Sequence, residues 1–370
     1  MVELMVALTV GLLVVGGLMT IFVQSSRTNL EMTRLVQQME NGRFALQVLR
    51  EDLWLAGYWG EYNPYPAAPT AMPPICTDFS TWSGDQKNIL RVPVSGADHP
   101  VIGSNTSVLN GCGRAIGDSS DTTVKRKAGT DVLMVRHTSP CIADGGTDNN
   151  CENFGANKLY LQVSRCTSDG TSFLLVTDPN DSDQTPFILK KKDTAGKMCD
   201  APTYTTTYAP RRKVLSNIYY IRDDNTLMRS ELDYDSTSGQ VRQQPPDPLI
   251  QGIEHLEIEY GIDYTPDANG DGLGDDGLPD AFVADPATLV PTQCASLWTA
   301  WGNVVAIKLY LLARTLDPSP GYDDAKVYQM GQVNPTRLPA SGGGFHDAYK
   351  RHVYTAFVRL NNPAGRRDRP

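Results

Sequence analysis

The chain of 370 residues opens with a long apolar segment that is preceded by a single charged residue. Residues 4–23 contain no Asp, Glu, Lys or Arg, and Glu3 stands directly before them. About 20 apolar residues in a helix span the hydrocarbon core of a bilayer. A carboxylate at membrane depth is costly, so we expect an amino group to neutralise Glu3, either the chain's own N-terminus or that of a neighbouring copy. The alternative is a plain single-pass anchor with Glu3 at the interface.

The helical pattern continues beyond the apolar segment. Gly42 is the only glycine between Val23 and Gly57, and the first proline is Pro64, so nothing forces a break before Ala56. Apolar residues recur at steps of three, four or seven and predict a packing face: Met32, Leu35, Met39, Leu46, Leu49, Leu53 and Ala56. We therefore expect three parts: residues 1–23 as the membrane half of one helix, residues 24–57 as its amphipathic half, and residues 58–370 as a globular head.

Two motifs connect this chain to a known family. The Val2-Glu3-Leu4 opening resembles the N-terminal signature of type IV pilins and pseudopilins, in which Glu3 matches a near-terminal glutamate. Residues 42–60 end in Ala56-Gly57-Tyr58-Trp59-Gly60 and resemble the helix end of the minor pilin family PilW. Residues 249–263, 304–314 and 354–362 are also similar in kind to that family.

The resemblance implies a non-enzymatic minor pilin. Such subunits form a priming or tip complex that starts assembly of the type IV pilus and supports twitching motility, adhesion and DNA uptake. The implied partners are other minor pilins, the tip adhesin, the major pilin and the inner-membrane assembly platform. The head would lie in the periplasm of a bacterium and later at the pilus tip or in the fibre. A minor pseudopilin of type II secretion and a membrane-anchored, calcium-stabilised adhesin or enzyme are the alternatives.

The resemblance also implies processing of the N-terminus. In this family a short basic leader ends in Gly, a peptidase cuts before Phe, and the new amino group is methylated. Met1 follows neither a leader nor a Phe. We therefore expect the true terminus to lie just upstream of Met1 if residues are missing from the start.

The head is expected to be mostly β. Short apolar or β-branched stretches alternate with Gly, Pro, Asn and Asp clusters, and residues 218–232 form the clearest hairpin candidate, with its turn at residues 223–225. Further strands are predicted at residues 89–94, 131–136, 159–163, 172–177, 187–190, 214–221, 253–260, 304–312 and 352–360. The predicted fold class is α+β, in which a long membrane-spanning helix packs on an antiparallel sheet with large loop insertions at residues 63–130 and 144–153.

Cysteine usage indicates an oxidising compartment. All seven cysteines lie beyond the membrane segment, and they form no Cys-x-x-Cys pair or Cys/His grouping with zinc spacing. Disulfides are therefore predicted among Cys76, Cys112, Cys141, Cys151, Cys166 and Cys199. The pairs suggested by proximity in the sequence are Cys76 with Cys112 and Cys141 with Cys151. Cys294 is the candidate for the unpaired thiol, or for an intermolecular bridge.

An acidic loop in the second half of the chain has the composition of a calcium site. Calcium takes six to eight oxygen ligands, and acidic side chains at alternating positions before a Gly supply that geometry. The candidate ligands are Asp267, Asn269, Asp271, the Leu273 carbonyl, Asp275, Asp276 and Asp280. Leu278 stands where an EF-hand has a bidentate Glu, so Asp276 or Asp280 would substitute. An acidic surface loop without metal is the alternative.

Charge and motifs argue against two other functions. With 33 basic and 42 acidic side chains and a net charge of −9, the chain offers no general nucleic-acid surface. No nucleophile elbow, His-Glu-x-x-His, P-loop or dinucleotide fingerprint occurs, and the five histidines are scattered along the sequence. His255 lies in an expected strand, where packing is the preferred interpretation.

Overall fold

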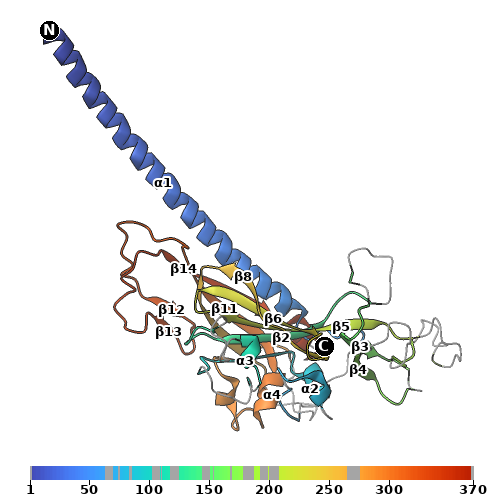
Figure 1. Ribbon diagram of the computed structural model, residues 1–370. Helices are drawn as coiled ribbons and strands as arrows, with labels where there is room; N and C mark the ends of the chain where they lie inside the picture. Colours follow the sequence, from blue (N-terminus) through green and yellow to red (C-terminus); the bar gives the residue numbers. More distant parts are fainter. Residues whose placement is uncertain are drawn as a thin grey trace.

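The computed structural model describes most of the chain. The described residues are 2–62, 70–73, 76–82, 86–101, 109, 111–116, 125–143, 151–152, 154–166, 169–177, 187–191, 199, 208–264 and 276–367. The fold is α+β. A long N-terminal helix, α1 (Val2–Leu55), extends from a β-rich head, and the last described helix, α5 (Asn361–Arg367), contacts α1 (Figure 1).

The head contains short helices and antiparallel strands. Its helical elements are η1 (Phe79–Thr81), α2 (Gln86–Arg91), α3 (Gly113–Ile116), η3 (Pro286–Leu289), α4 (Leu297–Gly302) and α5 (Asn361–Arg367). Its strands are β1 (Val94–Ala97), β2 (Val132–Thr138), β3 (Leu159–Val163), β4 (Phe173–Thr177), β5 (Arg211–Ile221), β6 (Thr226–Asp235), β7 (Gln240–Gln243), β8 (Asp247–Gln251), β9 (Ile253–Ile262), β10 (Ala281–Val283), β11 (Val304–Arg314), β12 (Tyr328–Met330), β13 (Thr336–Leu338) and β14 (Arg351–Arg359).

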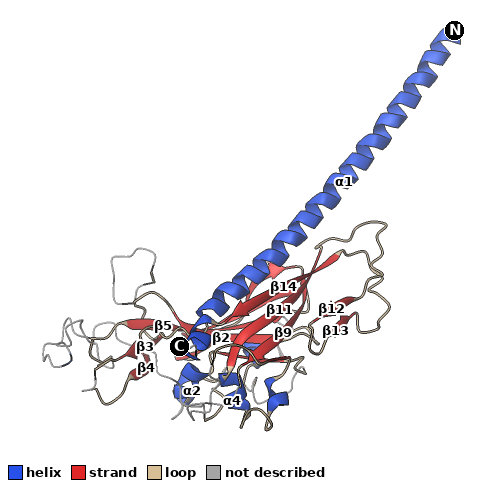
Figure 2. Cartoon of the chain, turned by 180° about the vertical axis from the view of Figure 1, so that it is seen from behind, coloured by secondary structure: helices blue, strands red, loops and turns tan. Residues whose placement is uncertain are grey.

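The strands form two main sheets. The first has eight strands in the order β1-β2-β5-β3-β4, and β6 extends it by pairing with β5, β7 and β8. The second has four strands in the order β10-β9-β11-β14, and β12 pairs with β13 in a separate ribbon. Helix α1 packs on β14 and β11 of the second sheet and also touches β2 and β8 of the first (Figure 2). The main apolar core lies between α1 and the two sheets and includes Leu49, Leu133 and Ile258.

The predicted hairpin is confirmed. Strands β5 and β6 pair antiparallel with Ile221 opposite Leu227, and the turn contains Asn225 at φ +63°. Asn tolerates this left-handed conformation better than most residues, because its short polar side chain bonds locally. The turn also connects to the second sheet, since the backbone N–H of Ile253 donates to the Asn225 carbonyl over 2.9 Å.

Two predicted strands are wrong. Residues 86–91 form helix α2 and β1 begins only at Val94, because Ile89 and Leu90 both turn inward and pack with Trp59 and Trp82 in a second core. Successive residues of a strand would point to opposite faces. Residues 187–190 form no extended strand, and Lys190 makes a single antiparallel bridge with Tyr208.

The packing face of α1 agrees in part with the predicted one. Leu49, Leu53 and Ala56 are fully buried as predicted, and Leu46 packs against the core. The buried helix residues are Gln38, Gly42, Ala45, Leu49 and Leu53. Met32 and Met39 belong to the predicted face but are 61% and 44% exposed. The helix approaches the sheet through small residues, and a Cβ added at Gly42 would overlap the Tyr354 ring of β14. This close approach turns the methionines away from the head.

We predict that Gly42→Ala destabilises the protein although alanine favours helices. The clash with Tyr354 should lower the free energy of unfolding by about 1 to 3 kcal/mol, as overpacking does. Gly365 is the matched control, because it lies in α5 with no atom within 4 Å of an added Cβ, and Gly365→Ala should stabilise by up to about 1 kcal/mol. Denaturant unfolding of the full chain in detergent measures both. A stabilising Gly42→Ala would contradict the close approach, and a Tyr354→Ala double-mutant cycle should give a coupling energy that relieves the clash.

Candidate assembly site

The N-terminal half of α1 has no cover within the described residues. Residues 2–30 are all exposed, including Glu3 in the first turn. The most apolar window of α1 has a mean hydropathy of 2.5 and is 0% buried. Among the described residues this is the one helix that is long and apolar enough to cross a membrane. Such an apolar surface requires a partner outside the chain, so this half of the helix fits a membrane anchor.

A buried glutamine fixes the position of α1 on the second sheet. The Gln38 side-chain amide donates to the carbonyl of Ala313 in β11 over 2.8 Å and to that of Lys350 over 3.0 Å. Gln38 is 4% exposed, so both bonds form away from water. A buried amide that loses its partners costs about 1 to 3 kcal/mol, so this residue opposes sliding of the helix along the sheet. One turn further, the Asn41 amide donates to the Gln251 carbonyl of β8 over 3.1 Å.

An ion pair holds α1 where it begins to leave the head. Glu31 accepts hydrogen bonds from Lys350 Nζ and Ser319 Oγ, each over 2.7 Å, and from Arg34 Nη1 over 2.8 Å. The hydrogen bond from Lys350 contributes most to lowering the pKa of Glu31 from 4.5 to about 2. Glu31 is therefore the first residue of α1 with strong polar contacts to the head. We call the contacts of residues 31–55 with the head the helix–head interface.

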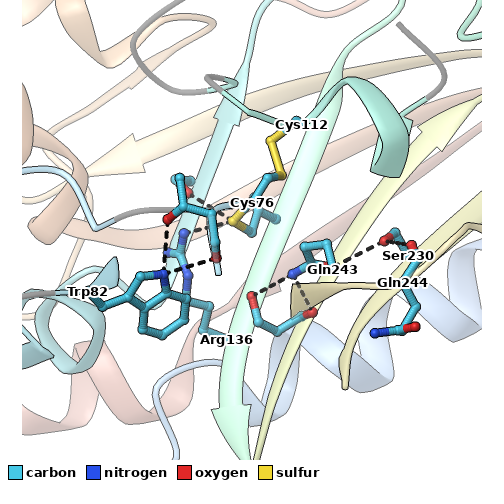
Figure 3. Close-up of a disulfide and its surroundings, with 11 residues drawn as sticks. Cys76, Trp82, Cys112, Arg136, Ser230, Gln243 and Gln244 are labelled. Atoms are coloured by element: carbon cyan, nitrogen blue, oxygen red, sulfur yellow. Dashed lines mark hydrogen bonds between the residues drawn. A yellow bond between two sulfur atoms is a disulfide. The ribbon is translucent and has the colours of Figure 1, made fainter. Parts of the chain in front are cut away.

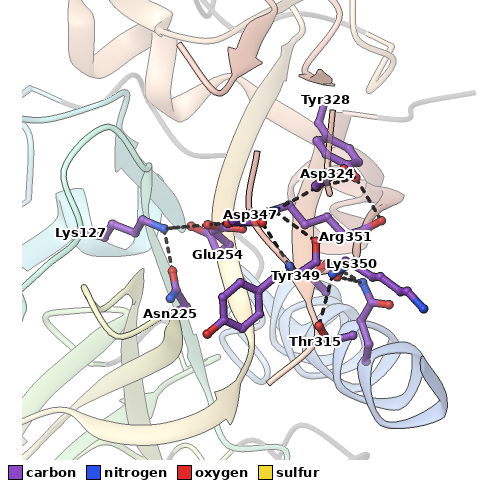
Figure 4. Close-up of polar contacts among 12 residues, drawn as sticks. Lys127, Asn225, Glu254, Thr315, Asp324, Tyr328, Asp347, Tyr349, Lys350 and Arg351 are labelled. Atoms are coloured by element: carbon purple, nitrogen blue, oxygen red, sulfur yellow. Dashed lines mark hydrogen bonds and ion pairs between the residues drawn. The ribbon is translucent and has the colours of Figure 1, made fainter. Parts of the chain in front are cut away.

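A buried arginine next to Lys350 bonds to carboxylates inside the head. Arg351, next to Lys350, donates to Asp324 over 2.9 Å, to Asp347 over 2.7 Å and to Glu254 of β9 (Figure 4). Its side chain is 1% exposed. A buried guanidinium of this kind requires paired carboxylates, and here they come from three separate segments. The cluster thereby fixes the start of β14, which carries the contacts to α1.

The C-terminal end of α1 is held by a second polar cluster. Asp52 accepts from His137 Nε2 of β2 over 2.7 Å and from the Asn217 amide of β5 over 3.1 Å. Burial alone lowers the pKa of His137, but the hydrogen bond to Asp52 and its charge outweigh burial, so the net pKa is raised. Gly57 then ends the helix at φ +71°, the left-handed conformation that glycine favours after a helix.

The stretch at residues 56–60, which carries the family resemblance, is a junction. The Gly57 N–H donates to the Arg136 carbonyl over 2.9 Å, and the Gly57 carbonyl accepts from Arg366 over 2.6 Å. The Trp59 indole, 1% exposed, donates to the Leu90 carbonyl over 2.9 Å. The segment that follows α1 is thus bonded to β2, to α5 and to α2.

The cysteines pair in three disulfides among the described residues. They are Cys76–Cys112, Cys141–Cys151 and Cys166–Cys199, with sequence separations of 36, 10 and 33 residues. The first two are the local pairs expected from the sequence. Cys294 is free and buried, and burial raises the pKa of its thiol. The Cys76–Cys112 bridge lies near Trp82, whose indole donates to Thr77, and near the buried Arg136 (Figure 3).

Most of the candidate calcium loop falls outside the described residues. This holds for Asp267, Asn269, Asp271, Leu273 and Asp275. The two ends of the loop are described and lie close together: Gly277 N donates to Asp263 Oδ2 over 2.9 Å, and Tyr264 N donates to Asp280 Oδ2 over 2.7 Å. Asp276 Oδ1 accepts from the N–H of Leu278. Asp280 therefore contributes one carboxylate oxygen to closing the loop.

A comparison with known protein families bears on the second half of the chain. The family model described as type IV pilus-assembly protein W, PilW, matches residues 218–362. The matched part runs from within β5 to within α5 and contains the strands on which α1 packs. This match confirms the resemblance to the PilW family over the second half of the chain and supports a role in the type IV pilus.

The chain was also compared with solved structures and with curated proteins. A type IV-like pilin from Thermus thermophilus is among the similar solved structures, with 13% sequence identity, coverage of 88% of this chain and 97% of that chain, and a TM-score of 0.31. No curated protein matches the chain.

We predict that Glu31→Gln weakens the helix–head interface in a pH-dependent way. Because the folded-state pKa of about 2 lies below the ordinary 4.5, the carboxylate stabilises the fold above pH 4.5, and this contribution is lost as the pH falls toward 2. At pH 7 the variant should be less stable by up to about 1 kcal/mol, since the pair is partly exposed. The difference from the parent protein should vanish near pH 2. Denaturant unfolding across this range measures it, with Glu40→Gln on the exposed side of α1 as the control. An equal difference at all pH values would contradict the ion-pair contribution.

Proposed function

We propose that this protein is a minor pilin that acts in a priming or tip complex of the type IV pilus. The observation that carries the proposal is the division of α1. Its first half is apolar and exposed, and its second half is fixed to a head that matches the PilW family. In this proposal the uncovered half enters a bundle of similar helices in the membrane. The role is structural, without a catalytic step.

The same proposal assigns the location and the partners. A helix of membrane length and a head with disulfides fit a single-pass protein of the bacterial inner membrane with a periplasmic head. The partners would be other minor pilins, the tip adhesin, the major pilin and the assembly platform. After assembly the protein would lie at the tip or in the fibre and contribute to twitching motility, adhesion and DNA uptake.

Glu3 is the proposed assembly residue. Its carboxylate would pair with the amino terminus of a neighbouring subunit, because a lone charge in the bundle is penalised and a paired charge is tolerated. This pairing would select one axial register between neighbouring helices. The exposed position of Glu3 at the start of α1 leaves it accessible to such a neighbour.

We predict that Glu3→Leu leaves the protein in the membrane but reduces its assembly. Loss of one partner of a desolvated pair leaves the other charge uncompensated, and a loss of about 1.4 kcal/mol already lowers association ~10-fold. Membrane fractionation should give equal amounts of variant and parent, while crosslinking to other pilins and the number of pili per cell should fall. Glu40→Gln, on the same helix but beyond the membrane half, should assemble normally. Normal piliation with Glu3→Leu as the only copy would refute the role of Glu3. Capture of type II secretion pseudopilins instead of pilins would refute the pilus assignment.

We also propose that the acidic loop at residues 267–280 binds calcium. The oxygen-rich sequence supports this, as do the hydrogen bonds that hold the ends of the loop together at Asp263 and Asp280. Asp271→Asn is then expected to lower calcium affinity by about tenfold or more and to remove the rise of the melting temperature with added CaCl2. Asp317→Asn, at an exposed position of the head, is the control. A calcium-independent melting temperature of the parent protein would refute the site.

A further inference from the structure

A cluster of histidine and carboxylate side chains lies where the two sheets meet. His99 follows β1 of the first sheet, and His255 and Glu257 project from one face of β9 in the second. Glu257 Oε2 lies 3.0 Å from His99 Nε2 and 3.0 Å from His255 Nε2. Residues distant in the sequence thus direct two imidazole nitrogens at a single carboxylate oxygen.

These distances match the spacing of ligands around a metal ion. Zn²⁺ binds imidazole nitrogen and carboxylate oxygen at about 2.0 to 2.2 Å, which places neighbouring ligand atoms of a tetrahedron ~3.4 Å apart. The ligand atoms of His99, His255 and Glu257 all lie within 4.8 Å of one another. The two imidazole rings are inclined by 67° with centroids 5.9 Å apart, so they converge without stacking.

The surrounding residues orient these three side chains as metal sites require. The second ring nitrogen of His99, Nδ1, lies 3.5 Å from Asp98 Oδ1, the arrangement in which a carboxylate orients a ligating imidazole. The other oxygen of Glu257, Oε1, accepts from Thr336 of β13 over 3.3 Å, which leaves Oε2 directed at the histidines. Glu257 and His255 are 2% and 4% exposed, so their positions are fixed by packing.

Asp131 holds the two halves of the cluster together. Its Oδ1 accepts from the backbone N–H of His99 over 3.0 Å, and its Oδ2 accepts from that of Ile258 in β9 over 2.8 Å. Its own N–H donates to the Leu256 carbonyl over 3.1 Å. His99 has the left-handed φ of +39°, which is uncommon for a residue with a side chain and is maintained here by these contacts.

Charge and composition favour a divalent cation at this place. Asp98, Asp131 and Glu257 bring three carboxylates close to His99, and Glu257 also reaches His255. A buried excess of carboxylate is costly unless a cation offsets it. Imidazole together with one carboxylate is a ligand set for Zn²⁺, Cu²⁺, Ni²⁺ or Fe²⁺ rather than for calcium. The disulfides indicate an oxidising compartment, where Fe²⁺ is disfavoured.

We propose that His99, His255 and Glu257 form a zinc site that links the two sheets of the head. The half-exposed side of His99 gives the ion access, and a water molecule completes the coordination. Asp98, Asp131 and Thr336 are positioning residues. The site is independent of the acidic calcium loop and of the role of Glu3, and its function is to join the β1–β2 region to β9.

The test is zinc binding by the full chain in detergent. The protein carries no histidine tag, is stripped with a chelator and is titrated with ZnCl2 by calorimetry in excess CaCl2, so that the acidic loop does not compete. The parent protein should bind one Zn²⁺ per chain. His255→Gln and Glu257→Gln should weaken binding at least ~100-fold. His346→Gln is the matched control, because His346 is exposed and pairs with Asp323 away from the cluster. Absence of stoichiometric binding, or unchanged binding by His255→Gln, would overturn the proposal.

A second variant keeps the test valid if a buried substitution disturbs folding. His99→Asn places a residue that tolerates positive φ at this half-exposed position, and the melting temperature of the metal-free variant serves as its own reference for the effect of zinc. Zinc should raise the melting temperature of the parent and of His346→Gln but not that of His99→Asn. An equal rise in all three proteins would place zinc elsewhere and overturn the site.

Discussion

The fixed contact between α1 and the second sheet is the constraint on which the rest of the molecule depends. The apolar half of α1 receives no support from the described head, so its direction is set by the part that is buried. Gly42 allows the backbone to approach Tyr354, and Gln38 fixes the register by bonding two strand carbonyls. Helix α1 is continuous from Val2 to Leu55, so its apolar half extends directly from the part that the head holds. The head therefore determines the direction in which the apolar half of α1 points.

The polar groups beneath the helix make this contact specific. A purely apolar interface tolerates sliding by a turn, whereas a buried amide or guanidinium is satisfied in one register only. Lys350 and Arg351 act as a pair at the start of β14: one reaches Glu31 on the helix, and the other reaches Glu254 and Asp324 inside the head. Buried ion pairs of this kind contribute little net stability but strongly penalise alternative arrangements.

The sequence predicted the helix, the α+β class and the β5–β6 hairpin because each depends on local pattern. The apolar run and the absence of Pro determine α1. Asn225 indicates the turn because asparagine tolerates the left-handed conformation that the turn requires. The packing face of α1 was predicted only in part. Hydrophobicity correctly indicated Leu49 and Leu53 but also favoured Met32 and Met39, where the sheet required small residues and a glutamine nearby. The division into two sheets and the proximity of His99 to His255 depend on contacts between distant segments. Such contacts leave no local pattern in the sequence, so they could not be predicted from it.

Contacts between the two sheets resist movement of one sheet against the other. Helix α1 contacts both of them, so any force on the membrane half is shared between β14 and β11 on one side and β2 and β8 on the other. Between the sheets, the described structure offers the apolar core, the Asp131 hydrogen bonds to β9 and the His99–Glu257–His255 contact. The apolar core resists separation of the sheets but is non-directional, so it resists shear weakly. The directional hydrogen bonds of Asp131 oppose the sliding that the core permits, and the proposed zinc ion at Glu257 would oppose it as well. The junction of the sheets therefore affects the direction in which α1 points.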